Sequence, residues 1–192
     1  MGVYLVNVDA KDWAGRGEDG YGHIASALDA ELARRGLPPY RPVKTEREFP
    51  GWFEEKISPS MDGFDALCRA HLTGPERGTL LDWSVLVPLS LREEIRLPVG
   101  SAYTDETLVA GAPQVLALAE RLAGIIGLPL DAIPATGSNL ELSLWFMEDE
   151  ARRAAEALPG PWTDDPDAAF YVAVYLRAAQ YSLRYGCPMT YV

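Results

Sequence analysis

The segment from Asp165 to Gly186 constrains the fold most strongly, because it has the signals of a helix that is apolar on most of its surface. Asp165 is a typical N-cap residue, Pro166 suits the first helical position, and Gly186 is typical of a helix end. The apolar and aromatic positions cover more of the circumference than one core-facing stripe requires: Phe170, Tyr171, Val172, Val174, Tyr175 and Leu176. We therefore expect this helix either to lie at the centre of the fold or to form the interface of a homo-oligomer.

Apolar spacing elsewhere predicts further helices and a small number of strands. Residues with a period of three to four predict helices over 21–35, 62–72 and 113–126. Runs of β-branched and aromatic residues predict strands over 3–8 and 83–87, with 92–99 beside the second. Because these elements do not alternate regularly, a doubly wound sheet is not favoured. The sequence predicts a helix-dominated α+β fold, with one domain over residues 1–192 and a small sheet flanked by four or five helices.

Residues 138–158 fit two patterns. Alternating leucines at the start are typical of a strand, whereas the spacing of apolar residues over the whole segment is typical of a helix. Ser138 and Glu141 have the spacing of a capping box, which favours a helix.

A long segment over 37–61 has neither a helix nor a strand period. It contains five prolines, and its aromatic residues distinguish it from a flexible linker. We expect a Pro/aromatic-rich loop, which at this length is often functional. Tyr and Trp are enriched at the centres of binding surfaces. We therefore take as candidate binding residues three side chains of this loop and one further tryptophan, although each ring taken singly could pack at the edge of the core: Tyr40, Trp52, Phe53 and Trp162.

The charge balance limits the classes of partner. Lys and Arg number 17 against 28 Asp and Glu, which gives a net charge of −11. An acidic surface repels phosphate backbones and anionic lipids, so no nucleic-acid or membrane partner is predicted. A protein partner is compatible with this charge, and a basic one would be attracted. Adjacent acidic residues such as Glu54 and Glu55 are expected on the solvated surface, because neighbours in a strand or helix do not face each other.

The N-terminal sequence and the apolar runs predict a cytoplasmic protein. MGVYLVNVDA lacks the basic flank and long apolar stretch of a signal peptide, and the longest uncharged run covers residues 107–119. A membrane span requires about 20 apolar residues. The excess of Arg over Lys is typical of a GC-rich genome, so we expect a bacterial source.

Few residues have the spacing of a catalytic centre. Asp9 and Asp12, after the first predicted strand, could join Asp19 and His23 in an oxygen-rich site of a small hydrolase. The alternative is that Asp9 and Asp12 shape a turn and Asp19 caps the next helix. Neither a metal nor another cofactor is predicted, because the sequence has none of the usual His and Cys ligand spacings.

Cys68 lies three residues before His71 on the same predicted helix face. Such a pair could form an activated thiolate, but it is also typical of core packing.

Two functions are compatible with these observations. The sequence favours a non-catalytic protein-interaction module, immunity-like or regulatory, over an enzyme, because acidity and aromatic loops are present without a catalytic motif. A small hydrolase using Asp9, Asp12 and His23 is the alternative.

Overall fold

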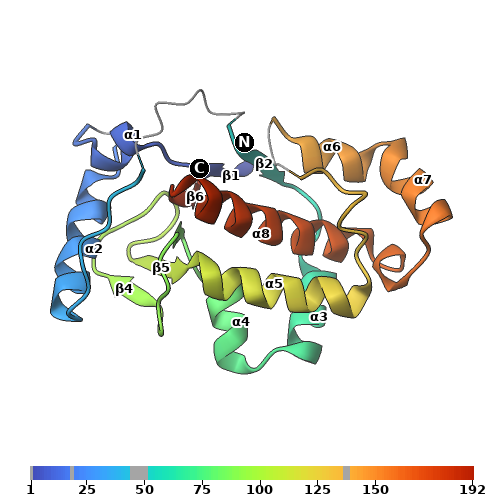
Figure 1. The fold of residues 1–192 in the computed structure, drawn as a ribbon, viewed down its shortest axis with the longest axis horizontal. Coiled ribbons are helices and arrows are strands. Elements are labelled where there is room, and N and C mark those ends of the chain that lie inside the picture. Colours follow the sequence, from blue (N-terminus) through green and yellow to red (C-terminus); the bar gives the residue numbers. More distant parts are fainter. Residues whose placement is uncertain (1, 18–19, 44–51, 136–138) are drawn as a thin grey trace.

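The computed structural model describes residues 2–17, 20–43, 52–135 and 139–192, and it confirms the α+β class. In these residues a single mixed sheet of six strands has helices packed on both faces (Figure 1). The strands are β1 (Val3–Asn7), β2 (Glu54–Ile57), β3 (Val85–Val87), β4 (Ile95–Leu97), β5 (Thr107–Gly111) and β6 (Met189–Tyr191).

The sheet has the strand order β2-β1-β6-β3-β5-β4. Only β3 and β5 pair in parallel among these neighbours, and the other pairs are antiparallel. Strand β6 therefore lies between β1 and β3, where Val6 and Val85 both pair with Thr190. This arrangement places the C-terminal strand inside the sheet instead of at its edge.

The helices form two groups. Helices α1 (Ala10–Ala14) and α2 (Gly22–Arg34) cover one face, where Val85, Val87 and Val109 join the buried side chains of α2. The opposite face, with Leu86 and Ala110, packs against the larger group. That group consists of α3 (Asp62–His71), α4 (Gly74–Leu81), α5 (Ala112–Ile126), α6 (Glu141–Met147), α7 (Asp149–Ala157), a short 3-10 helix (Pro161–Thr163) and α8 (Pro166–Tyr185).

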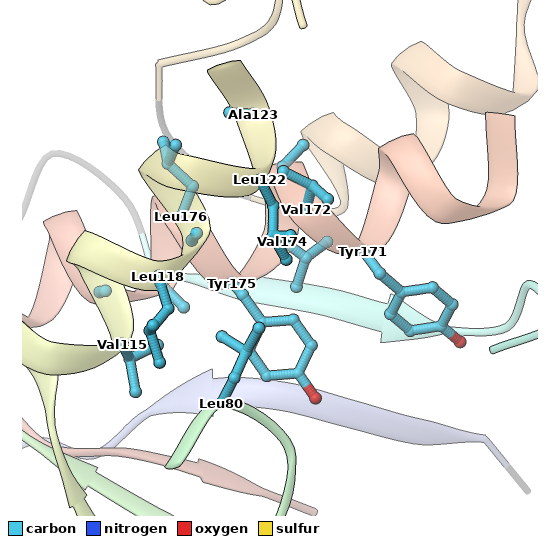
Figure 2. Close-up of a cluster of buried hydrophobic side chains, with 14 of the residues drawn as sticks. Leu80, Val115, Leu118, Leu122, Ala123, Tyr171, Val172, Val174, Tyr175 and Leu176 are labelled. Carbon is cyan, nitrogen blue, oxygen red and sulfur yellow. The ribbon is translucent and has the colours of Figure 1, made fainter. Parts of the chain in front are cut away.

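Helix α8 lies at the centre of the larger core. Fourteen of its 20 residues are buried, and its main partner is α5. In Figure 2 the ring of Tyr175 of α8 lies beside Leu80 of α4, and Leu118 of α5 is close to both in the same core cluster. The predicted helix is thus confirmed, and burial inside one chain is sufficient to explain its apolar circumference. Homo-oligomerisation stays a prediction.

The cap of α8 also agrees with the sequence. The Asp165 carboxylate accepts a hydrogen bond from the backbone N–H of Ala168 at 2.9 Å. We expect Asp165→Ala to lower the free energy of unfolding by about 1 kcal/mol, because the first turn then loses an acceptor. Urea unfolding followed by circular dichroism measures this. The matched control is Asp164→Ala, which removes the exposed neighbouring carboxylate, and equal losses for both variants would contradict the capping role.

The segment 37–61 is not wholly a loop, and this part of the prediction is wrong. Its last part forms β2, which pairs antiparallel with β1 so that Leu5 lies opposite Glu55. Phe53 and Glu55 are both buried, with Ile57 partly buried, so the segment does alternate like a strand. The alternation was hidden because a carboxylate occupies one of the inward positions. Phe49 lies outside the described residues.

The described part of this segment, residues 139–158, contains two helices, α6 and α7, which meet at Glu148. The helical prediction is therefore correct, but a single continuous helix is not observed. Ser138 of the expected capping box lies outside the described residues, and Leu140 occupies the N-cap position with a φ of 65°.

The sequence patterns do not predict five short elements, namely α1, α4, β5, β6 and the 3-10 helix. Helix α4 begins with a capping box, in which the Thr73 N–H donates to the Glu76 carboxylate at 2.8 Å. The predicted pairing of 92–99 beside β3 is also wrong, since β4 pairs with β5. Short elements have too few residues to show a period, so only their neighbours in the sheet define them.

Candidate functional site

The carboxylates after β1 have a structural role. Asp9 is the N-cap of α1, and its Oδ1 accepts hydrogen bonds from the N–H groups of Lys11 (2.8 Å) and Asp12 (2.7 Å). His23 lies with Nε2 3.2 Å from the carbonyl oxygen of Gly100, instead of contacting either carboxylate. Asp19 lies outside the described residues, and Tyr21 holds the N-cap position of α2. These contacts favour the turn-forming alternative for Asp9 and give the hydrolase hypothesis no geometric support.

The two cysteines are unsuited to nucleophilic chemistry. Cys68 and Cys187 are free and buried. Burial raises the pKa of each thiol to about 12, and Asp65 adds to the effect at Cys68. A thiol with such a pKa is almost wholly protonated near neutral pH, whereas the thiolate is the nucleophile. Cys68 lies in the core whereas His71 is exposed, so core packing accounts for the cysteine but not for the histidine.

Three of the four predicted binding residues are core residues, so the four rings do not form one exposed surface. Tyr40 donates its hydroxyl to the Gly186 carbonyl at 3.0 Å, and Phe53 packs on Tyr181 with ring centroids 5.4 Å apart. Trp162 donates its indole N–H to the Leu158 carbonyl at 3.0 Å. Trp52, at 42% exposure, is the one ring of the four that is open to solvent. Its binding role stays a prediction.

Glu55 is unusual among the acidic residues because it is completely buried, with 0% of its surface exposed. Its carboxylate accepts hydrogen bonds from the N–H groups of Leu142 (2.8 Å) and Ser143 (2.9 Å), and from the Ser143 hydroxyl (2.7 Å). Burial raises its pKa, while these hydrogen bonds lower it and nearby Glu141 raises it further. Glu55 thus caps α6 from another element, and the expectation that it lies on the solvated surface is wrong.

The backbone of β2 reinforces this attachment. The N–H of Leu140 donates to the carbonyl of Glu54 at 2.9 Å, so two successive residues of β2 hold the start of α6. The left-handed backbone of Leu140 turns the chain at this point. Helices α6 and α7 lie at one end of the molecule (Figure 1), and these hydrogen bonds connect the start of α6 to the sheet.

The outer side of this end combines exposed apolar and acidic side chains. Met147 is 77% exposed and Leu144 is 48% exposed, on the side of α6 away from buried Leu142. Residues 141–167 contain eight acidic and two basic side chains, so this short stretch holds a large part of the net charge of −11. Both arginines are already paired with acidic neighbours on α7. We call the following residues the acidic α6–α7 surface, which includes Asp167 of α8 because it lines the same hollow as Met147: Glu141, Leu144, Met147, Glu148 and Asp167.

Sequence reasoning had not singled out this surface. The signal was present, because 148–150 is an acidic run next to apolar residues. However, the helical period alone does not tell which of Leu140, Leu142, Leu144 and Met147 face the core.

Comparisons with protein-family models, with curated proteins and with solved structures gave no match to this chain. The described helices include none with both the length and the apolar character needed to cross a membrane. Over the same residues, no group of three or more His, Cys, Asp or Glu side chains is placed to hold a metal ion. The geometry of the surface and of its attachment is therefore what bears on function.

Proposed function

We infer that this protein is a non-catalytic interaction module that binds a basic protein through the acidic α6–α7 surface. The observation that carries this proposal is the exposure of Met147 and Leu144 in the most acidic part of the chain. Exposed apolar side chains rimmed by polar ones mark interaction sites. Methionine is especially suited to such sites because its flexible side chain adapts to a partner.

The attachment of α6 supports the same proposal. A surface that is fixed before binding loses less conformational entropy when the partner arrives. Glu55 and the Glu54 carbonyl hold the first turn of α6, which fixes the position of Leu144 and Met147. The acidic side chains would attract a basic partner over longer distances and orient it, while the two apolar side chains would supply contact area. An immunity-like role, in which the module covers a basic surface of a toxin, and a regulatory role are both forms of this activity.

The test is capture of host proteins on the immobilised full chain at low ionic strength, followed by affinity measurements with the protein identified. Glu148→Gln/Asp167→Asn is expected to weaken binding about fivefold, because charges at the rim chiefly change the association rate. Met147→Ser is expected to weaken it about tenfold or more, as loss of a central apolar contact does.

The matched control is Glu93→Gln/Glu120→Gln, which removes the same charge from exposed positions elsewhere. We expect this control to bind like the wild type and the captured protein to be basic. An acidic partner, or equal binding by all variants, would refute the proposal.

A further inference from the structure

A pocket of about 300 Å³ lies between α1, the first half of α2 and residues 41–42. Helices α1 and α2 are at the end of the molecule opposite α6 and α7, so this pocket is separate from the acidic α6–α7 surface (Figure 1). Its volume is at the lower end of the range for small-molecule sites. Its lining combines an apolar wall with two arginines and includes Trp13, Ala25, Pro42, Arg16, Arg41 and Asp29.

Tyr40 packs against the buried side of the apolar wall and fixes its position. Trp13 is buried, and its ring packs edge-on against Tyr40 with centroids 5.7 Å apart. Tyr40 is fixed at both ends, because its hydroxyl donates to the Gly186 carbonyl and its N–H donates to the Asp29 carboxylate, each at 3.0 Å. The pocket therefore exists in the absence of a ligand, which reduces the entropy lost on binding.

The connection between α1 and α2 is equally close. The N–H of Gly22 donates to the carbonyl of Gly15 at 2.8 Å, and the N–H of Tyr21 donates to the carbonyl of Asp12 at 2.9 Å. A Cβ at Gly22 would lie 2.5 Å from the Gly15 carbonyl oxygen, which is too short for any other residue without movement. Glycine at this position keeps α1 near α2 and so sets the width of the pocket.

Of the three charged side chains in the lining, two form an ion pair with each other. The Asp29 carboxylate forms an ion pair with Arg41 and accepts the Tyr40 N–H. Arg16, by contrast, is exposed and has no hydrogen bond or ion pair with a residue in the described parts of the chain. The lining contains two arginines and one carboxylate, so its formal charge is positive in a chain of net charge −11. A guanidinium is well suited to bind a carboxylate through two parallel hydrogen bonds.

We propose that this pocket binds a small organic carboxylate, whose charge pairs with Arg16 while its apolar body lies against Trp13 and Pro42. A monoanion fits better than a phosphate dianion, because the lining already contains the Asp29 carboxylate and Asp12 is exposed on α1. The inference is independent of the proposed function, since the two sites are at opposite ends of the molecule.

The test uses the full chain and benzoate as the probe, with binding followed by saturation-transfer NMR and calorimetry. We expect a dissociation constant on the order of 1 mM, as the small size of the probe implies. Benzamide, which has the same shape without the charge, should bind at least about tenfold more weakly, and phenyl phosphate should not bind more tightly than benzoate.

Arg16→Gln separates this site from nonspecific attraction. It should weaken benzoate binding about tenfold and leave the urea midpoint unchanged, because Arg16 is exposed and has no partner in the described fold. The matched control is Arg92→Gln, an exposed arginine on another loop, which should bind like the wild type. Absence of benzoate binding, equal binding of benzamide, tighter binding of phenyl phosphate, or no effect of Arg16→Gln would each overturn the proposal.

Discussion

Glu55→Ala is expected to lower the free energy of unfolding by about 3 kcal/mol, one of the two largest effects that we predict for a single substitution. The variant leaves the N–H groups of Leu142 and Ser143 and the Ser143 hydroxyl without their acceptor in a buried place. Each buried donor that loses its partner costs about 1–3 kcal/mol, and removal of the buried carboxylate offsets part of the total. Urea unfolding measures the loss.

Hydrogen exchange shows whether the loss arises where we expect. The amides of Leu142 and Ser143 should exchange faster in Glu55→Ala relative to the amides of α8. The matched control is Glu54→Ala, since the contact of Glu54 with Leu140 is made by its backbone carbonyl and survives the substitution. A stability within about 0.5 kcal/mol of the wild type for Glu55→Ala would contradict the capping role.

The pH dependence of Glu55→Gln gives a second measure of the same group. Burial raises the pKa of Glu55 in the folded protein, so the folded chain retains this proton at a pH where the unfolded chain has lost it. The resulting stabilisation is complete below the unfolded pKa and is lost as the pH rises through the folded pKa. Glutamine does not titrate, so the variant lacks this stabilisation. The difference in free energy of unfolding between the wild type and Glu55→Gln should therefore be larger at about pH 5 than at about pH 7. A larger difference at pH 7 than at pH 5 would show that the hydrogen bonds lower the pKa of Glu55 by more than burial raises it.

Phe64→Ala is expected to lower the free energy of unfolding by about 3–5 kcal/mol, as is usual when a large aromatic side chain is removed from a core. Phe64 is fully buried on α3 and stacks on Tyr171 and Tyr175 of α8, with ring centroids 5.5 and 5.4 Å apart. The cavity would lie between α3 and the central helix, where little rearrangement can fill it. Urea unfolding and the near-ultraviolet circular dichroism of the aromatic residues should both report the change.

The control for Phe64→Ala is Tyr103→Ala, which removes an aromatic ring that is 59% exposed. Its effect should stay within about 0.5 kcal/mol. Phe64→Leu should fall between the two, because it retains most of the apolar volume. A loss for Phe64→Ala no larger than that for Tyr103→Ala would mean that the helices α3 and α8 close the cavity.

The long helices could be predicted because their signals are local. The apolar residues of α5 recur every three to four positions, and the Asp165–Pro166 start of α8 lies next to the turn that it caps. Strand β6 could not be predicted in the same way, since three residues show no period and their place between β1 and β3 depends on the whole sheet.

The candidate site was harder to predict than the fold. Residue type and local sequence mark Tyr40, Phe53 and Trp162 as candidates, but each ring packs against a residue far along the chain. These partners are Gly186 for Tyr40, Tyr181 for Phe53 and Trp145 for Trp162. For the same reason the local sequence does not indicate the exposure of Met147, which is among the most exposed apolar side chains of the described residues.

The sequence by itself determined the α+β class, the long helices with the cap of α8, and the acidic charge of the chain, because these properties depend on composition and on residues within about four positions of each other. The tertiary structure alone decided the order of the strands, the exposure of each aromatic ring and the burial of Glu55. The physical reason is distance along the chain: the groups that satisfy the Glu55 carboxylate belong to residues 87 and 88 positions away, and only folding brings them within hydrogen-bonding reach.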